Sequence, residues 1–338
     1  MRVAVIGAGS FGTVLASVAK SNGHQVTLWA RTTVQAEAIN RQGVNERYHP
    51  KLKLEGVSAS SDLAVVVDCA DLVILSVPSK GMAEVCAKLR LLLPANVGLV
   101  STTKGIQADG FLMMSEVIEK ACPGHPVGVL SGPNLAAEIA ERHLTAAVIA
   151  SPSAHLRERA TQVLGCRYLR LYSATDRVSV ELGGALKNIY AIACGLAAAL
   201  NVGANTQAAL MTRALAEMSR LASHLGGNPM TFLGLAGVGD LIVTCSSPLS
   251  RNYRVGWLLG QGRTLDQAES EIGQVAEGIN TLKLIHAKAQ SMGVVMPIVA
   301  GLHDVIFGQM PARSVAMKLM QAAHTSDVEF VLPHTPGP

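Results

Sequence analysis

Aromatic and charged residues are both scarce in this chain of 338 residues, at 4% and 15%. So few aromatic side chains offer no surface for stacking nucleic-acid bases. The net charge of +4 is spread along the chain without a polybasic run, which gives no positive case for nucleic-acid binding and suits an anionic small molecule. Because 49% of the residues are hydrophobic, the chain is not a disordered protein, and its length allows two domains with separate cores.

The six cysteines form no C-x-x-C pair, and the ten histidines show no H-E-x-x-H or other ligand spacing. We therefore expect reduced thiols and no metal. The longest apolar run, Ile189–Leu200, has about half of the roughly 20 residues of a membrane helix and indicates a buried helix. The chain opens with a strand rather than a signal peptide, so we expect a soluble, cytoplasmic protein without membrane insertion.

The opening segment combines a short apolar strand, a glycine-rich turn and a helix. Gly7, Gly9 and Gly12 form G-x-G-x-x-G, followed by an expected helix over Thr13–Ser21 and a second strand over Gln25–Trp29. The first glycine permits the tight turn, the second lets the backbone approach a pyrophosphate, and the third lets the helix pack on the strand. A chance glycine turn does not explain why a strand, the turn, a helix and a second strand follow one another at the expected spacing. The segment therefore predicts a dinucleotide site.

The end of the second strand bears on which dinucleotide binds. NAD-selective folds usually carry an acid there, but this strand is followed by Ala30 and Arg31, with no acid before Glu37. Arg31 can pair with a 2′-phosphate and stack on adenine, although a solvated surface arginine is the alternative. The sequence favours NADP(H) and leaves NAD(H) open.

The remaining chain divides into two halves with different patterns. Strands alternating with helices indicate an α/β fold, with an N-terminal Rossmann-type doubly wound sheet in residues 1–177. An all-helical C-terminal domain is expected in residues 178–324, followed by a loose tail, 325–338. The expected strands are Asp71–Pro78, Val97–Ser101, Val127–Leu130, Ala146–Ala150 and Tyr168–Tyr172, with helices over Met82–Leu93 and Phe111–Ala121. The expected helices of the second half are Glu181–Leu200, Gln207–Leu225, Pro229–Leu235, Thr264–Glu271, Ile279–Met292, Pro297–Phe307 and Ala312–Leu319.

Lys187 is the first residue outside the glycine turn that could do chemistry. It is the only basic residue between Arg177 and Arg213, in a helix of small and apolar side chains. A lysine away from bulk water tends to have a lowered pKa, which suits proton transfer. The alternative is a lysine whose stem is buried and whose ammonium reaches water.

Two further polar segments stand out. Glycines crowd the approach to Asp240, which opens an apolar helix and has the alternative role of a plain N-cap. Ser250, Arg251 and Asn252 place a hydroxyl, a guanidinium and an amide in succession, enough donors for one phosphate. The alternative for this segment is a polar helix start with a solvated face.

Taken together, these motifs closely resemble the bacterial NAD(P)-dependent sn-glycerol-3-phosphate dehydrogenase family. The matching segments are G-A-G-S-F-G-T in the first turn, T-K-G-I at Thr103–Ile106, S-G-P-N-L-A at Ser131–Ala136, G-A-L-K-N-I at Gly184–Ile189, A-G-V-G-D-L at Ala236–Leu241, S-R-N at Ser250–Asn252 and V-A-E-G at Val275–Gly278. They follow the family's order and spacing over most of the chain.

The resemblance implies reversible reduction of dihydroxyacetone phosphate to sn-glycerol 3-phosphate, a phospholipid precursor, with Lys187 as proton donor. It implies that Lys104 and Asp240 belong to the catalytic site. The implied substrate contacts are Lys104, Gly132, Asn134, Lys187, Asp240, Ser250, Arg251 and Asn252. The implied cofactor contacts, besides the three glycines, are Ser10, Phe11, Arg31, Lys104, Ala136, Arg251, Val275 and Glu277.

Two other functions remain open at this point. A ketopantoate reductase or a 6-phosphogluconate relative would share the expected architecture, although Ser250, Arg251 and Asn252 argue against both. A non-catalytic NADP(H) sensor would have no need for Lys187. A homodimer through the apolar helical half is compatible with the sequence, and no residue demonstrates it.

Overall fold

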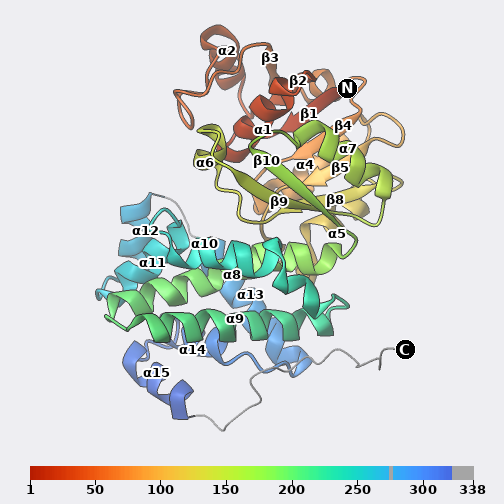
Figure 1. Cartoon of the computed structure of the whole chain (residues 1–338). Helices are drawn as coiled ribbons and strands as arrows, with labels where there is room; N and C mark the ends of the chain where they lie inside the picture. The colour runs from red at the N-terminus through yellow and green to blue at the C-terminus, as the bar shows by residue number, and fades with distance from the viewer. Residues whose placement is uncertain (274–276, 322–338) are drawn as a thin grey trace. The chain divides into compact units, whose positions relative to one another are not determined.

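The computed structural model describes residues 1–273 and 277–321, which divide into two compact units (Figure 1). The first unit comprises Met1–Ala185 and Leu235–Asp240, and the second comprises Leu186–Gly234 and the described residues from Leu241 onward. The expected boundary at residues 177/178 is the start of helix α8 (Arg177–Ala199), whereas the units divide further along that helix. The tail expected at 325–338 lies outside the described residues.

An eight-stranded sheet forms the centre of the first unit, in the order β10-β9-β8-β5-β4-β1-β2-β3. Its strands are β1 (Arg2–Ile6), β2 (Gln25–Trp29), β3 (Val57–Ser60), β4 (Leu72–Leu75), β5 (Gly98–Ser101), β8 (Val127–Ser131), β9 (Thr145–Ala150) and β10 (Leu169–Ala174). Neighbouring strands are parallel except β8 and β9. The near-continuous apolar strand β4 is buried throughout, as expected for a parallel strand covered on both faces.

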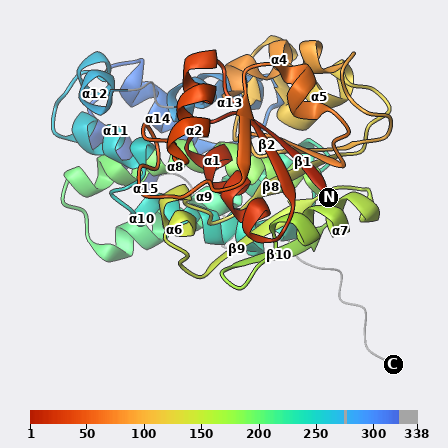
Figure 2. The ribbon, with the colours of Figure 1, turned by 90° about the horizontal axis from the view of Figure 1, so that it is seen from above.

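Helices cover both faces of this sheet, because successive side chains of each strand point to opposite sides. Val3 and Val5 of β1 belong to one core with α1 (Ser10–Ser21) and α7 (Ala154–Leu164). Ala4 and Ile6 belong to the other core. That second core includes α3 (Leu63–Val67), α4 (Met82–Leu89) and α5 (Met114–Ala121), and Figure 2 shows α4 and α5 on the side of the sheet opposite α7. The predicted doubly wound Rossmann-type domain is confirmed.

Several elements differ from the expected boundaries. Helix α1 begins at Ser10 rather than Thr13, since Gly9 already takes the N-cap position. Helices α4 and α5 are shorter than expected, ending at Leu89 and beginning at Met114. The pattern gave no expectation for α2 (Thr33–Gln42), β3, α3, α6 (Ala136–Ala140), α7, or the short hairpin β6 (Ile106–Gln107) and β7 (Leu112–Met113). These elements are short or polar and carry little periodicity.

The described part of the second unit is helical and contains no strand, as predicted. Beyond α8 its helices are α9 (Ala204–His224), α10 (Asp240–Ser246, of which Asp240 belongs to the first unit), α11 (Arg251–Gly260), α12 (Leu265–Ile272), α13 (Glu277–Met292), α14 (Pro297–Ile306) and α15 (Ala312–Gln321). Pro229–Leu233 forms a 3₁₀ helix rather than the expected α-helix. Helices α8 and α11 approach closely, because a Cβ on Gly195 would overlap the Tyr253 carbonyl and one on Gly256 the Ile192 carbonyl.

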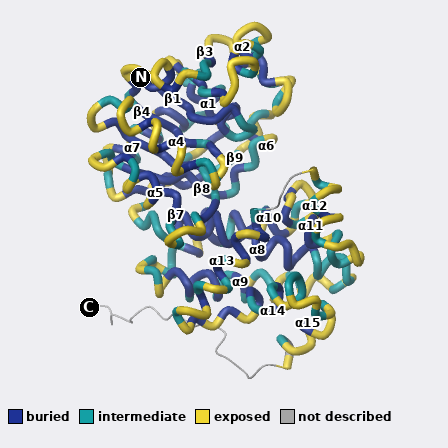
Figure 3. Tube along the Cα trace, turned by 180° about the vertical axis from the view of Figure 1, so that it is seen from behind, coloured by how far each residue is buried: buried dark blue, intermediate teal, exposed yellow. Residues whose placement is uncertain are grey.

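Helix α8 is longer than the apolar run that predicted it. Among the described residues it is the one helix long and apolar enough to cross a membrane, and 78% of its most apolar window is buried inside the protein. Figure 3 shows this burial as dark blue along the helix. Extensive burial of this kind is typical of a core helix, in agreement with the predicted buried helix.

Candidate functional site

The glycine-rich turn between β1 and α1 has the shape that its three glycines require. Gly7 has a φ of 122°, and a Cβ there would overlap the Ser76 carbonyl oxygen. A Cβ on Gly12 would overlap the carbonyl oxygen of Gly7, so this position holds the turn against the helix. Around Gly9, in contrast, no atom lies within 4 Å of an ideal Cβ. Two glycines are therefore needed for folding, and the third leaves open space at the turn.

The N-terminus of α1 faces this open space without a side-chain cap. Gly9 is the N-cap residue, and the first turn of α1 contains no acidic residue. Such a terminus presents backbone N–H groups and a positive dipole end, which favour an anion. Ser10 and Phe11 are half-buried first residues of α1, and Arg31 is exposed just beyond β2. The N-terminus of α1 therefore has the chemistry to hold a dinucleotide phosphate group.

Lys104 is the centre of a polar cluster in the first unit. Its Nζ lies 3.0 Å from Oδ2 of Asp240, 3.0 Å from Oδ1 of Asn134 and 3.3 Å from the carbonyl oxygen of Gly132. Three acceptors match the three N–H groups of an ammonium. Asp240 is 1% exposed and Asn134 is 7% exposed, so the cluster is largely removed from water.

The loop after β5 holds Lys104 in this place. The hydroxyl of Thr102 donates to the carbonyl oxygen of Leu75 at 3.2 Å, and that of Thr103 donates to the carbonyl of Val77 at 2.6 Å. Both acceptors lie at the end of the neighbouring strand β4 or just beyond it. Lys104 therefore projects from a loop fixed to the sheet, as a positioned functional lysine requires.

Two buried polar atoms beside this cluster have no hydrogen-bond partner within the described residues. They are Nδ2 of Asn134 and Oγ of Ser131, both in the loop that begins at the end of β8. Leaving a buried donor unsatisfied costs about 1–3 kcal/mol, so an unpaired amide at a candidate site points to a ligand acceptor. Gly132, between them, has a φ of 121°, which favours glycine.

Helix α8 packs closely against this cluster within the first unit. An ideal Cβ on Gly184 would lie 2.8 Å from Oγ of Ser131 and 3.3 Å from Cγ of Lys104. Only glycine leaves room for the lysine stem at this point of the helix.

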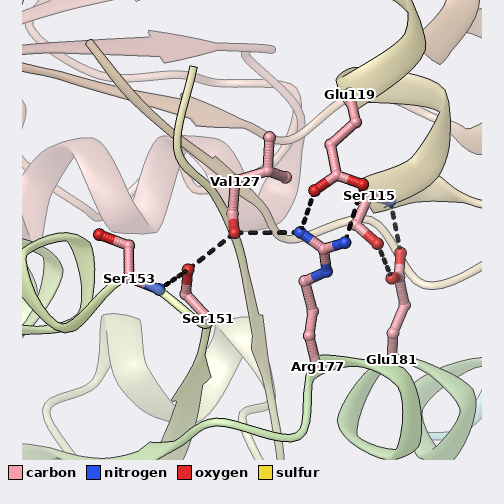
Figure 4. Close-up of polar contacts among 7 residues, drawn as sticks. All are labelled: Ser115, Glu119, Val127, Ser151, Ser153, Arg177 and Glu181. Atoms are coloured by element: carbon pink, nitrogen blue, oxygen red, sulfur yellow. Dashed lines mark hydrogen bonds and ion pairs between the residues drawn. The ribbon is translucent and has the colours of Figure 1, made fainter. Parts of the chain in front are cut away.

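Two polar contacts fasten the start of α8 to α5 (Figure 4). Arg177 donates to both carboxylate oxygens of Glu119, at 2.6 and 2.9 Å. The buried carboxylate of Glu181 accepts from the backbone N–H of Ser115 at 2.9 Å and from its hydroxyl at 2.5 Å. Burial raises the pKa of Glu181 to about 7, against the opposing effect of these hydrogen bonds. No sequence motif indicates this anchor, because its partners are far apart along the chain.

The alternative role of Asp240 as a plain N-cap is wrong. Leu235–Gly239 forms a π-helical segment that runs directly into α10, so Asp240 lies inside a continuous helical stretch. The glycines at 237 and 239, which crowd the approach to Asp240, do not interrupt this stretch, because the backbone keeps a helical path through them. A π-helical insertion is frequent at functional sites and turns the side chain that follows it.

In the second unit, Asn252 links two helices that carry expected site residues. Its Nδ2 donates to Oδ1 of Asn188 at 2.9 Å, next to Lys187 on α8. Its Oδ1 accepts from the backbone N–H of Gly278 at 3.1 Å, next to Glu277 at the start of α13. Asn252 thus bridges these helices and keeps one N–H for a further acceptor. Lys187 itself is 6% exposed.

The other expected residues occupy helix starts. The hydroxyl of Ser250 caps α11 by accepting from the N–H of Tyr253 at 3.3 Å, and Arg251 is the exposed first residue of that helix. The polar helix start is therefore present, and capping leaves the hydroxyl hydrogen able to donate. Ala136 begins α6 and Glu277 begins α13, both half-buried. Val275 lies outside the described residues.

Three residues of the stretch that runs from α2 toward β3 also reach the glycine-rich turn, although no sequence motif indicates them. Gln35, Asn45 and His49 contact Ala8, Thr13 and Ser10 through side-chain hydrogen bonds. Among the described residues there is no group of three or more His, Cys, Asp or Glu side chains that could hold a metal ion.

Comparison with known proteins agrees on one family over most of the chain. The profile of the NAD-dependent glycerol-3-phosphate dehydrogenase N-terminus matches residues 2–157, and that of its C-terminus matches residues 176–317. A glycerol-3-phosphate dehydrogenase [NAD(P)+] of Azotobacter vinelandii is 52% identical over 330 residues, covering 97% of both chains. The crystal structure of glycerol-3-phosphate dehydrogenase from Coxiella burnetii has a TM-score of 0.89 and 35% identity, covering 95% of this chain and 99% of that chain.

A ketopantoate reductase structure from Ralstonia eutropha resembles the chain in fold alone. It shares 17% identity and has a TM-score of 0.60, covering 95% of this chain and 100% of that chain. A likeness at this level carries no argument for its activity.

Proposed function

Because the chain belongs to the NAD-dependent glycerol-3-phosphate dehydrogenase family, we propose that it catalyses the reversible, NAD(P)H-dependent reduction of dihydroxyacetone phosphate to sn-glycerol 3-phosphate. The reaction takes up one hydride and one proton at the C2 carbonyl of the substrate. The chain must therefore hold a phosphorylated ketone, orient its carbonyl and supply a proton to the oxygen.

The cluster around Lys104 carries this proposal. A buried carboxylate, an amide and a lysine ammonium meet within 3.0 Å contacts, and the amide keeps an unpaired donor, Nδ2 of Asn134. In the proposed site, that donor and Gly132 contact the substrate, and Lys104 holds it near the cofactor. Asp240 orients the ammonium of Lys104, which needs a fixed partner once substrate oxygens compete for its protons.

The proposed cofactor contacts follow the open turn at Gly9. Gly7, Gly9, Gly12 and Ser10 hold the pyrophosphate at the N-terminus of α1, where nothing fills the space beside Gly9. Phe11 and Ala136 contribute apolar contacts, and Lys104, Arg251 and Glu277 polar ones; Val275, outside the described residues, stays a prediction. When bound, the reduced nicotinamide supplies the hydride.

Lys187 is the proposed proton donor to the carbonyl oxygen. It is 6% exposed, so its ammonium acts away from bulk water, where it also stabilises the developing negative charge. Lys187 lies three residues beyond Gly184 along α8, and residues with this spacing share one helix face. Ser250, Arg251 and Asn252 are the proposed ligands of the substrate phosphate, whose binding energy fixes the carbonyl.

Four further features belong to the same proposal. Arg31 is exposed at the end of β2 without an acid beside it, which supports a preference for NADP(H) over NAD(H). The product would serve glycerophospholipid synthesis. The burial of α8 supports a soluble protein, whereas a cytoplasmic location and a homodimer remain predictions.

The test is the loss of absorbance of the reduced cofactor with dihydroxyacetone phosphate, run in parallel with NADPH and NADH. Rapid oxidation that depends on the substrate is expected, faster with NADPH. Ketopantoate serves as the comparison substrate. Oxidation with ketopantoate but not with dihydroxyacetone phosphate would replace the proposal with the reductase alternative. Cofactor binding without turnover of either substrate would favour the sensor.

A further inference from the structure

His49 contacts the first residue of α1, although it lies in the segment between α2 and β3. Its Nε2 is 2.9 Å from Oγ of Ser10 and 3.1 Å from the carbonyl oxygen of Ser10. Both residues belong to the first unit and both are half-buried. One ring nitrogen therefore contacts two oxygen atoms of the same serine.

The two contacts determine which ring nitrogen of His49 carries a proton. A carbonyl oxygen only accepts, so Nε2 must carry a hydrogen to approach the Ser10 carbonyl at 3.1 Å. Burial lowers the pKa of His49 below its usual value of 6.5, opposed by the hydrogen bond to the Ser10 backbone, so the ring is neutral near pH 7. A neutral ring with hydrogen on Nε2 has no lone pair there to accept from the serine hydroxyl. His49 is thus a donor to Ser10, and the hydroxyl hydrogen of Ser10 stays available for another acceptor.

Two amide side chains hold the same turn, that of Asn45 from this segment and that of Gln35 from α2. Nδ2 of Asn45 donates to the carbonyl oxygen of Ala8 at 3.1 Å and to the hydroxyl oxygen of Thr13 at 2.8 Å. Nε2 of Gln35 donates to the Ala8 carbonyl at 3.0 Å. Asn45 is 3% exposed, so its contacts are protected from water. These bonds fix the backbone around Ser10, and of the three side chains only that of His49 contacts the Ser10 side chain.

We propose that His49 is a positioning residue of the cofactor site, which occupies the acceptor face of the Ser10 hydroxyl and leaves its hydrogen directed to the dinucleotide pyrophosphate. This inference rests on the proposed function, because it requires a pyrophosphate at the N-terminus of α1. The second bond, to the Ser10 carbonyl, fixes the imidazole so that the serine keeps one orientation. A serine oriented before the cofactor arrives loses less freedom on binding, which raises affinity.

The experiment is a direct measurement of Kd for NADPH and NADH by fluorescence titration of the full chain. The variants are His49→Leu, His49→Gln, Ser10→Ala and the double variant His49→Leu/Ser10→Ala. His49→Leu is expected to weaken NADPH binding about 3- to 10-fold, the range for one neutral hydrogen bond. Glutamine can place a donor where Nε2 of histidine lies, so His49→Gln is expected to recover most of the affinity.

Two controls separate positioning from a general loss of structure. Adenosine 2′-monophosphate lacks the pyrophosphate, so its affinity should be the same in the wild type and His49→Leu. His143→Leu makes the same substitution at an exposed histidine, whose Nε2 lies 3.6 Å from Oε2 of Glu141, and should leave NADPH affinity unchanged. In the Ser10→Ala background, His49→Leu should cause no further loss, because the hydroxyl that it positions is absent.

The possible outcomes distinguish this inference from the proposed function. If the wild-type chain binds NADPH and His49→Leu binds it equally well, the role of His49 is wrong and the proposed function stands. Equal losses for NADPH and adenosine 2′-monophosphate, or additive losses in the double variant, would also overturn it. If the wild type binds neither NADPH nor NADH, both conclusions fail.

Discussion

Lys104 and Asp240 form an ion pair in the first unit, with 3.0 Å between Nζ and Oδ2, although 136 residues separate them in the sequence. The two ends of the pair differ in burial, because the Asp240 side chain is 1% exposed and that of Lys104 is 21% exposed. Removing the Lys104 ammonium should therefore cost more stability than removing the Asp240 charge. A buried carboxylate without its cation is costly, whereas a partly exposed ammonium can turn to water.

Lys104→Met is expected to destabilise the protein by about 3 kcal/mol, because it removes the cation that faces the buried Asp240 carboxylate. Asp240→Asn should cost less, since Lys104 keeps its contacts with Gly132 and Asn134. Urea unfolding midpoints of the two variants and the wild type measure the difference. Equal destabilisation by both variants would show that the carboxylate does not depend on the lysine for its burial.

Gly9 and Gly12 offer a matched pair of alanine substitutions in the glycine-rich turn. Gly12→Ala should destabilise the fold, since its Cβ would overlap the Gly7 carbonyl. Gly9→Ala meets open space and should cost no more than about 1 kcal/mol, because alanine is a poorer N-cap than glycine. Because a pyrophosphate would approach the backbone at Gly9, Gly9→Ala should weaken NADPH binding at least about tenfold. Thermal unfolding and fluorescence titration give the two readings. Undiminished affinity of Gly9→Ala would place the phosphates elsewhere.

Arg31 should control the choice between the two cofactors. In Arg31→Ala the KM for NADPH is expected to rise about 10- to 100-fold, the range for a charged hydrogen bond to the 2′-phosphate. The KM for NADH should change by less than about threefold, since NADH lacks that phosphate. Arg41→Ala removes an exposed arginine from the last turn of α2 and serves as the control. Parallel losses for both cofactors would assign Arg31 to a general electrostatic role.

The local parts of this fold were the predictable parts. The β1–turn–α1 unit follows from glycine spacing within a dozen residues, and β2 has the predicted bounds, Gln25–Trp29. Strand β3, with the sequence V-S-A-S, has little hydrophobic signal and forms because β2 offers it an edge. Hydrophobic periodicity could not predict β3, since the strand with which it pairs is a separate segment of the chain.

The candidate site was predicted as a list of residues rather than as a set of contacts. Family resemblance selected Lys104, Asn134 and Asp240, and the structure shows that they meet in the first unit. Neither spacing nor composition indicates that Glu181 is bonded to Ser115, 66 residues earlier, or that His49 reaches Ser10. Such pairs depend on the order of the strands in the sheet, and local sequence patterns do not specify that order.

Lys187→Met should separate proton transfer from cofactor binding. Methionine retains an apolar stem in this buried position, so the fold should persist while kcat falls about 10²- to 10⁴-fold, the usual contribution of one general acid. The Kd for NADPH should stay within about twofold of the wild-type value. Lys88→Met, at an exposed lysine paired with Glu84, is the control. Retention of most activity in Lys187→Met would remove this lysine from the mechanism.

Glu181 should make the stability of the protein depend on pH. Burial raises the pKa of its carboxyl from 4.5 to about 7, so between these values the folded state binds a proton that the unfolded state has lost. Stability therefore falls as pH rises through this window, by at most about 3 kcal/mol from this group. Glu181→Gln has no proton to lose, so it should gain stability relative to the wild type between pH 5 and pH 8.

Glu217 in the second unit provides an independent repeat of this test. Its carboxylate accepts from the backbone N–H groups of Ile298 and Val299 and from the hydroxyl of Tyr190, while burial raises its pKa to about 7. The free energy of unfolding of Glu181→Gln, Glu217→Gln and the double variant is measured with urea at pH 5, 6, 7 and 8. Each substitution should reduce the dependence of this free energy on pH, and the two reductions should add, because the hydrogen bonds of the two carboxylates involve different residues. If the wild type and Glu181→Gln keep a constant difference across this range, Glu181 titrates at the same pH in the folded and unfolded states. The hydrogen bonds from Ser115 would then offset the whole cost of its burial.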